Sequence, residues 1–225
     1  MNSPSRPVVA AFDLDGTLTE GGSVFNWLRY VGGAGLVNKN AFRLAIPLTI
    51  GGIRSGAHAD NAKERLFHSV LAGRDEAEVR ALSREFILHH LAEESRDHVL
   101  ARLRWHLEQG HDVVIVSASP QLYVDVVAEE LGAAGGLGTR LAIDARGKLT
   151  GSYLGKNCRG SEKMRRLTEW IASREYGEEP LIYAYGNSRG DRRLLAMAQF
   201  GFDCGKLGMF GALRHYQRLS HSPDY

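Results

Sequence analysis

Three short apolar runs in the chain each end in small polar residues. The first covers residues 8–13 (VVAAFD) and is followed by Gly16; the other two cover residues 112–117 and 181–186. Continuous apolar runs of this length, rich in β-branched residues, predict strands that are buried on both faces of a sheet. Because parallel sheets bind their ligands at the carboxyl ends of the strands, we expect the functional site where these runs end.

Helical patterns accompany these strands. Residues 120–131, 161–176 and 190–200 carry apolar positions at helical spacing, and each of these segments predicts a helix. Strands that alternate with helices are typical of an α/β fold with a Rossmann-like core, in which helices flank a parallel sheet. Residues 141–154 alternate in polarity around a turn at 144–147, which predicts a β-hairpin at the edge of this core.

The stretch between the first and second apolar runs contains no good strand pattern. It predicts five helical segments, interrupted by glycine pairs, at residues 23–31, 41–53, 59–71, 76–94 and 96–109. The last segment is assigned to the core, and the first four predict an all-helical cap inserted after the first strand. The predicted organisation is a catalytic core of residues 1–20 and 100–225 with a helical cap of residues 21–99.

Composition narrows the class of protein. The chain has 225 residues, of which 44% are hydrophobic and 24% charged, as expected of a globular protein with one core and a smaller insertion. Its formal net charge of +2 gives no reason to expect a nucleic-acid partner. Cys158 and Cys204 have no CxxC spacing, the histidines show no zinc motif, and no run of 18 apolar residues occurs. These features favour a cytoplasmic protein without a transmembrane segment.

The strongest chemical signal is the sequence Asp13-Leu14-Asp15-Gly16-Thr17. Two carboxylates at the end of a buried strand lose solvation, and a functional role would justify that cost. A turn at Gly16 allows both side chains to reach one pocket, where Thr17 would orient Asp15 or a phosphate oxygen. The competing interpretation is an acidic turn that caps a helix, with Thr17 as a buried turn hydroxyl.

Together with the polar residues after the second and third strands, this motif resembles the haloacid dehalogenase superfamily of phosphatases. The resemblance extends over nearly the whole chain, to the phosphoserine-phosphatase-like branch (subfamily IB) with a helical C1 cap. It implies that Asp13 is a nucleophile and Asp15 a general acid and base. It also implies that the Ser117 hydroxyl, with the backbone amide of Ala118, binds a phosphoryl oxygen.

Two further motifs of that superfamily are matched later in the chain. Lys163 fits the lysine that neutralises the transferred phosphoryl group, with Lys156 as the competing candidate. The sequence GNSRGD at residues 186–191 resembles the metal-binding motif, but Asn187 replaces the usual first aspartate and brings an oxygen without a negative charge. The implied Mg²⁺ ligands are Asp13, the Asp15 carbonyl, Asn187 and Asp191.

The resemblance implies a Mg²⁺-dependent phosphomonoester hydrolase that acts on a small phosphorylated metabolite through an aspartyl-phosphate. The glutamate that recognises phosphoserine in this branch is replaced by Gly22, and Glu20 lies out of register. The apolar segment 41–53 leaves open a lipid- or isoprenoid-phosphate substrate, and Lys63 and Arg65 could reach an anionic substrate group. The sequence is also compatible with a phosphotransferase and with a weakly active or non-enzymatic regulatory protein. It does not determine the oligomeric state.

Overall fold

The core of the protein is a parallel six-stranded sheet. The computed structural model describes residues 6–38, 56–207 and 211–219. All pairings in the sheet are parallel, and the strand order is β3-β2-β1-β6-β7-β8. The three strands predicted from the apolar runs, β1, β2 and β6, lie next to one another in its middle. The strands are β1 Val8–Phe12, β2 Asp112–Pro120, β3 Gly135–Thr139, β6 Leu181–Gly186, β7 Phe200–Asp203 and β8 Gln217–Arg218.

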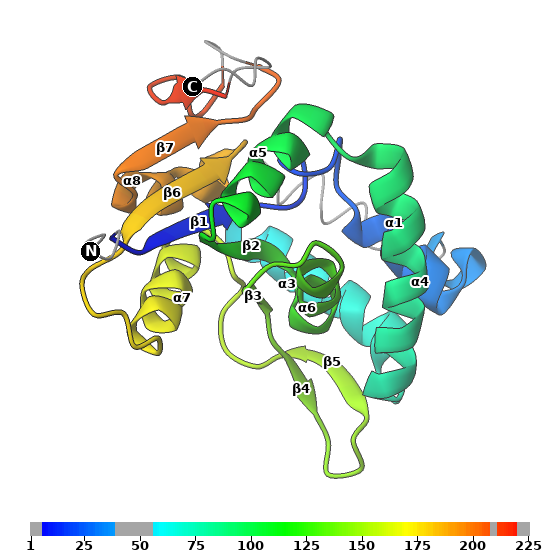
Figure 1. Ribbon diagram of the computed structural model, residues 1–225. Helices are drawn as coiled ribbons and strands as arrows, with labels where there is room; N and C mark the ends of the chain where they lie inside the picture. The colour runs from blue at the N-terminus through cyan, green and yellow to red at the C-terminus, as the bar shows by residue number, and fades with distance from the viewer. Residues whose placement is uncertain (1–5, 39–55, 208–210, 220–225) are drawn as a thin grey trace.

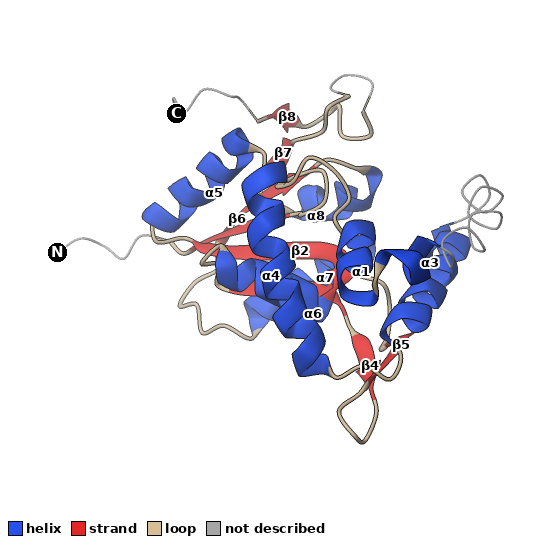
Figure 2. Cartoon of the chain, turned by 90° about the vertical axis from the view of Figure 1, so that its right-hand side faces the viewer, coloured by secondary structure: helices blue, strands red, loops and turns tan. Residues whose placement is uncertain are grey.

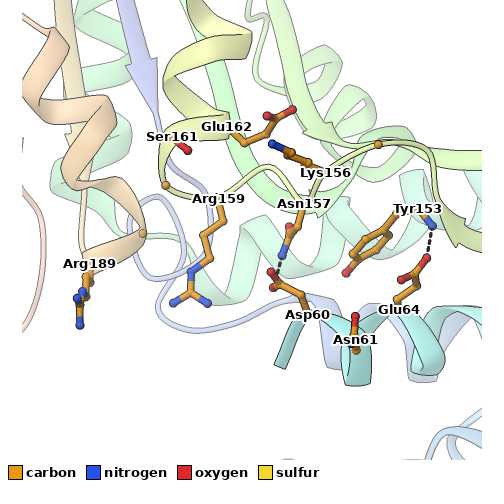
Figure 3. Close-up of a pocket in the computed structure, with 13 residues that line it drawn as sticks. Asp60, Asn61, Glu64, Tyr153, Lys156, Asn157, Arg159, Ser161, Glu162 and Arg189 are labelled. Atoms are coloured by element: carbon orange, nitrogen blue, oxygen red, sulfur yellow. Dashed lines mark hydrogen bonds between the residues drawn. The ribbon is translucent and has the colours of Figure 1, made fainter. Parts of the chain in front are cut away.

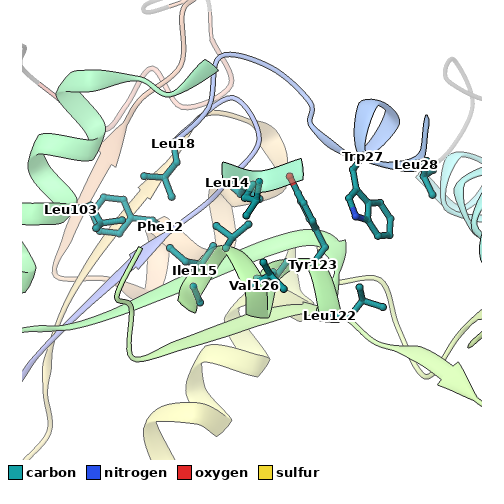
Figure 4. Close-up of a cluster of buried hydrophobic side chains, with 14 of the residues drawn as sticks. Phe12, Leu14, Leu18, Trp27, Leu28, Leu103, Ile115, Leu122, Tyr123 and Val126 are labelled. Carbon is teal, nitrogen blue, oxygen red and sulfur yellow. The ribbon is translucent and has the colours of Figure 1, made fainter. Parts of the chain in front are cut away.

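Helices cover both faces of the sheet (Figure 1). Helices α5 (Asp97–Glu108) and α6 (Gln121–Glu130) pack on one face, and α7 (Ser161–Ala172) and α8 (Arg192–Met197) on the other. The alternation of β1 explains this layering, because Phe12 faces the first pair of helices and Ala11 the second. Figure 4 shows part of the larger cluster, including Phe12, Ile115 and Tyr123. The predicted α/β fold is confirmed.

In the described part of the insertion after β1, three helices gather beside the sheet: α1 (Val24–Gly32), α3 (Gly56–Leu71) and α4 (Glu76–Glu94). Figure 1 shows α1 and α4 to the right of the core strands, and Figure 2, the view from that side, shows them in front of β2. The chain leaves and re-enters the core at adjacent points, because Glu20 N donates to Glu94 O at 2.7 Å and Arg96 N to Leu18 O at 2.8 Å. These two short links join the helices to the core.

Helix α3 is held in place by the predicted hairpin, which consists of β4 (Leu141–Ile143) and β5 (Leu149–Tyr153). Gly151 has a φ of +77°, and a Cβ atom there would lie 2.3 Å from the Cα atom of His68 on α3. Only glycine permits this approach of strand and helix backbones. The contact fixes the helix that carries Asp60 and Lys63 toward the carboxyl ends of the core strands.

Some predicted helices end earlier than expected. The helix predicted over 161–176 ends at Ala172, and that over 190–200 is a 3-10 turn, η1 (Arg189–Asp191), followed by α8. Phe200 belongs instead to β7, where its ring stacks on Tyr183 with centroids 4.6 Å apart. Strand pairing therefore outweighs the helical pattern at this point.

Three further sequence predictions concern disulfides, the membrane and the cap. Cys158 and Cys204 are both buried and unpaired. No helix in the described ranges is long and apolar enough to span a bilayer. The predicted helix 41–53, and with it the apolar entrance for a lipid substrate, lies outside the described residues.

Candidate active site

The site forms where β1, β2 and β6 end, as the sequence predicts. Asp13 directly follows β1, and its backbone N–H donates to Tyr185 O on β6 at 3.0 Å. The loop then turns at Gly16, which has a φ of +81°. A Cβ atom there would lie 2.0 Å from the side-chain amide nitrogen of Asn187. Glycine at position 16 thus lets the loop turn and brings the Asn187 amide against it.

Lys163 joins two carboxylates inside this site. Its Nζ atom lies 2.5 Å from Asp13 Oδ1 and 2.6 Å from Asp191 Oδ1, and all three side chains are buried. Burial lowers the pKa of Lys163, but the charges of Asp13 and Asp191 outweigh burial and hold it above its usual value. Burial and then the charge of Asp191 raise the pKa of Asp13 to about 7, against the opposing effect of Lys163. One ammonium group between two buried carboxylates leaves an excess of negative charge.

Asp15 points into the same pocket but has different partners. Its Oδ1 atom accepts hydrogen bonds from the backbone N–H and the hydroxyl of Ser23, both at 2.6 Å. Its Oδ2 atom accepts from Ser119 Oγ at 2.8 Å. Three donors from two separate segments therefore fix the orientation of the carboxylate.

Asp191 also organises the loop after β6. Its Oδ2 atom accepts hydrogen bonds from Ser188 N at 3.0 Å, from Ser188 Oγ at 2.9 Å and from Asn187 N at 3.3 Å. Since Oδ1 binds Lys163, both oxygens already have donors. Asp191 thus links Lys163 to the backbone of Asn187 through hydrogen bonds.

The hydroxyl of Thr17 donates to Asp13 Oδ2 at 2.9 Å. The hydroxyl therefore orients Asp13 and not Asp15, while its predicted contact with a phosphate oxygen stays a prediction. Ser117 is buried at the end of β2, and its Oγ atom accepts from Ser119 N at 3.1 Å. The carbonyl of Ala118 accepts from Thr139 Oγ1 and from Lys63 Nζ, each at 2.9 Å.

Lys63 brings a second ammonium group to the pocket from helix α3. Burial lowers its pKa, while the charges of Asp15 and then Asp60 oppose that shift. Arg65, two residues further along α3, is exposed and is absent from the pocket lining. Of these two basic residues, the fold brings only Lys63 to the two aspartates.

These groups line a pocket of about 250 Å³ that contains Asp13, Asp15, Ser117 and Lys163. Lys156, the competing lysine, is exposed and lies in the lining of a second cavity of about 670 Å³. Figure 3 shows this outer cavity between α3 and the loop before α7. The two cavities share the residues Asp60, Asn157, Arg159 and Gly190, so the outer cavity adjoins the carboxylates.

The oxygen atoms around Asp13 are suitable ligands for a hard divalent cation. Mg²⁺ prefers oxygen ligands, and the Asp13 carboxylate, the Asp15 carbonyl and the Asn187 amide belong to the adjoining loops that meet at Gly16. The excess negative charge next to Lys163 would be offset by such a cation. The residues present therefore fit the expected metal.

Several residues of the site were not predicted from the sequence. They are Ser23, which was expected only at the start of a helix, together with Asp60, Ser119, Thr139, Asn157 and Arg159. Ser119 could have been found, because it lies two residues after Ser117 at the end of the same strand. The rest come from distant segments and carry no local motif.

Comparison with known proteins identifies the family. A family model described as haloacid dehalogenase-like hydrolase matches residues 10–196. Protein CicA of Caulobacter vibrioides is 34% identical over 197 residues, which cover 86% of this chain and 84% of CicA. A probable phosphatase of Mycobacterium tuberculosis is 32% identical over 200 residues, covering 86% of this chain and 67% of that protein. The chain belongs to the haloacid dehalogenase-like hydrolases, as its motifs predicted.

Solved structures share the fold. A protein of unknown function from Bordetella pertussis has a TM-score of 0.81 at 22% identity, covering 97% of this chain and 100% of that one. A phosphoserine phosphatase solved as an analogue of its phospho-aspartyl intermediate has a TM-score of 0.60 at 18% identity, covering 90% of this chain and 89% of that one. These likenesses concern the architecture of core and inserted helices.

Proposed function

We propose that the protein is a Mg²⁺-dependent phosphatase that hydrolyses small phosphomonoesters through a phosphorylated Asp13. The observation that carries this proposal is the convergence of Asp13, Asp15 and Lys163 on one pocket of about 250 Å³. Phosphoryl transfer depends mainly on in-line positioning and on neutralisation of negative charge, and a nucleophile beside a buried ammonium group meets both needs. The named phosphatases among its relatives support the same function.

In the first step, an Asp13 oxygen attacks phosphorus and the bond from phosphorus to the leaving oxygen breaks. Protonated Asp15 gives its proton to that oxygen, so that an alcohol departs. In the second step, Asp15 takes a proton from water, the water oxygen attacks phosphorus, and the bond to Asp13 breaks. Inorganic phosphate leaves, and both aspartates return to their starting states.

The remaining residues of the site bind and orient. We assign the phosphoryl oxygens to the Ser117 hydroxyl, the Ala118 amide and Lys163, with Lys63 as a further cation from α3. Thr17 holds Asp13, and Asp191 holds Lys163, through the hydrogen bonds already described. Residues 21–99 would form the cap that closes over this pocket and excludes water.

Bound Mg²⁺ would supply positive charge next to the transferred phosphoryl group. We propose that Asp13, the Asp15 carbonyl and Asn187 hold it. Asp191 was expected to be a ligand as well. Its two oxygens accept four hydrogen bonds, against the two that Asp13 accepts, and we therefore propose that Asp191 acts mainly by positioning Lys163 and the Asn187 backbone.

The proposal is tested by hydrolysis of an aryl phosphate with millimolar Mg²⁺. We expect turnover by the unmodified protein and a loss of at least about a thousandfold in Asp13→Asn, since the nucleophile is gone. Asp97→Asn, which changes an exposed aspartate on α5, is the matched control and should keep full activity. Full activity in Asp13→Asn would refute the proposed function.

A further inference from the structure

In the outer cavity, the acidic side chains have hydrogen-bond partners, whereas the basic side chains have none among the described residues. Each of its carboxylates already accepts at least one hydrogen bond: Asp60 from Asn157 Nδ2 and Glu64 from Tyr153 N, both at 2.7 Å, and Glu162 from Arg165 and Arg166. Its three cations differ, because no hydrogen bond or ion pair joins their side chains to any other residue in the described ranges. These cations are Lys156, Arg159 and Arg189.

Arg159 is the cation nearest to the reacting groups. It lines both the pocket that contains Asp13 and the outer cavity, and its charge contributes to the lowered pKa of Lys63. In Figure 3, Arg159 lies between Asp60 and Arg189, and the two arginine side chains extend from their loops toward the same side. A group leaving the phosphorus atom toward the outer cavity would meet Arg159 first.

The backbone around Arg159 is well anchored. Gly160 N donates to Gly190 O at 3.0 Å, which joins the loop before α7 to the turn after β6. A Cβ atom at Gly190 would lie 3.4 Å from Arg159 Cγ and Nε, so the arginine side chain rests directly on that turn. The same turn carries Ser188 and Asp191, and the position of Arg159 is thereby coupled to the catalytic loop.

We propose that the outer cavity binds the leaving group and that Arg159, assisted by Arg189, selects substrates whose alcohol part carries a second anionic oxygen group. A planar guanidinium group pairs with a carboxylate or a phosphate through two parallel hydrogen bonds. The volume of about 670 Å³ is ample for a small organic acid. This inference rests on the proposed phosphatase function and adds the substrate class to it.

The test compares four phosphomonoesters that differ in the charge of the alcohol part. They are 3-phosphoglycerate with a carboxylate, propane-1,3-diol bisphosphate with a second phosphate, neutral glycerol 3-phosphate and cationic phosphoethanolamine. We expect kcat/KM for at least one of the two anionic probes to exceed that for glycerol 3-phosphate by about tenfold, the effect of one charge-assisted hydrogen-bonded pair. The better of the two probes identifies the anionic group.

Arg159→Met should reduce that preference to near one, Arg159→Lys should keep part of it, and Arg146→Met should keep all of it. Arg146 is a suitable control because it is exposed on the turn between β4 and β5 and does not line the outer cavity. A ratio of two substrates measured on one sample does not depend on how much of a variant is folded. An unchanged ratio in Arg159→Met, or equal hydrolysis of the neutral or cationic probe, would overturn the inference while leaving aryl phosphate hydrolysis intact. Absence of all hydrolysis, aryl phosphate included, would instead defeat the proposed function itself.

Discussion

The side-chain nitrogen of Lys63 on helix α3 lies 2.9 Å from the carbonyl oxygen of Ala118 at the end of strand β2. This bond joins the inserted helices to the segment that is proposed to bind phosphate. The positive charge in the pocket therefore comes from both parts of the chain: Lys163 from α7 in the core and Lys63 from the insertion. The pocket therefore contains both lysines only when α3 lies over the core.

Lys63→Met is expected to lower kcat/KM for an aryl phosphate by at least about tenfold, because one of the cations that balance the phosphoryl charge is lost. Inhibition by inorganic phosphate should weaken in parallel. Both quantities can be measured by steady-state kinetics. Arg65→Met is the matched control on the same helix. Equal behaviour of the two variants would show that Lys63 only anchors α3.

Lys163→Met is expected to destabilise the fold by about 3–5 kcal/mol, because Asp13 and Asp191 would face one another in a buried site without their shared cation. The free energy of unfolding in urea measures this effect. Adding Asp191→Asn should recover part of the loss. The control is Lys148→Met, since Lys148 pairs with Asp75 in an exposed bridge that should contribute at most about 1 kcal/mol. Similar losses for the two lysines would contradict this expectation.

Asn187→Asp is expected to tighten Mg²⁺ binding by roughly tenfold, because a carboxylate adds a negative charge to the oxygen donors. Isothermal titration of Mg²⁺ measures this without reference to activity. Asn61→Asp, an exposed change on α3, should leave the affinity unchanged. An unaltered affinity in Asn187→Asp would place the metal away from residue 187.

The lowered pKa of the buried His106 side chain predicts how the stability of the fold depends on pH. Burial, then the charges of His111 and Arg102, lower its pKa from the usual 6.5 to about 3, and its Nε2 atom lies 2.8 Å from Tyr185 Oη. His106 thus stays neutral in the folded protein while the unfolded chain takes up a proton below pH 6.5. This contribution to stability is complete above pH 6.5 and is lost as the pH falls toward 3, by at most about 1.4 kcal/mol per pH unit.

Urea unfolding at about pH 6 and about pH 5 tests this dependence, because both values lie between the unfolded and folded pKa of His106. The unmodified protein should lose stability between the two values, and His106→Gln should lose distinctly less. His89→Gln, which changes an exposed histidine on α4, should follow the unmodified protein. Identical slopes for the unmodified protein and His106→Gln would contradict the prediction.

The sequence predicts the three central strands of the sheet but not the outer ones. Strands β1, β2 and β6 are continuous apolar runs, whereas β3 (GGLGT) and β7 (FGFD) contain glycine where a strand normally has side chains to pack. In β3 the reason is tertiary, since a Cβ atom at Gly138 would lie 2.7 Å from Gln121 Cα on α6. A contact between distant segments has no local pattern.

The same distinction applies to the site. Asp13, Asp15, Ser117 and Lys163 lie in short motifs, and the structure brings all four into one pocket. Asp60 on α3 and Arg159 in the loop before α7 reach that pocket only because the fold brings these two segments together. Residues proposed to bind the leaving group are therefore much harder to predict from the sequence than those proposed to surround the phosphorus atom.

The phosphorylated state of Asp13 can be observed directly. Enzyme mixed with an aryl phosphate and Mg²⁺, quenched and treated with borohydride, should contain homoserine at position 13, because reduction of an aspartyl-phosphate converts its carboxyl group to an alcohol. Mass spectrometry of the peptide that contains residue 13 measures this conversion. We expect homoserine at position 13 only when substrate is present, and none at position 15. Sustained hydrolysis with residue 13 unmodified, or homoserine at another residue, would contradict the proposed mechanism.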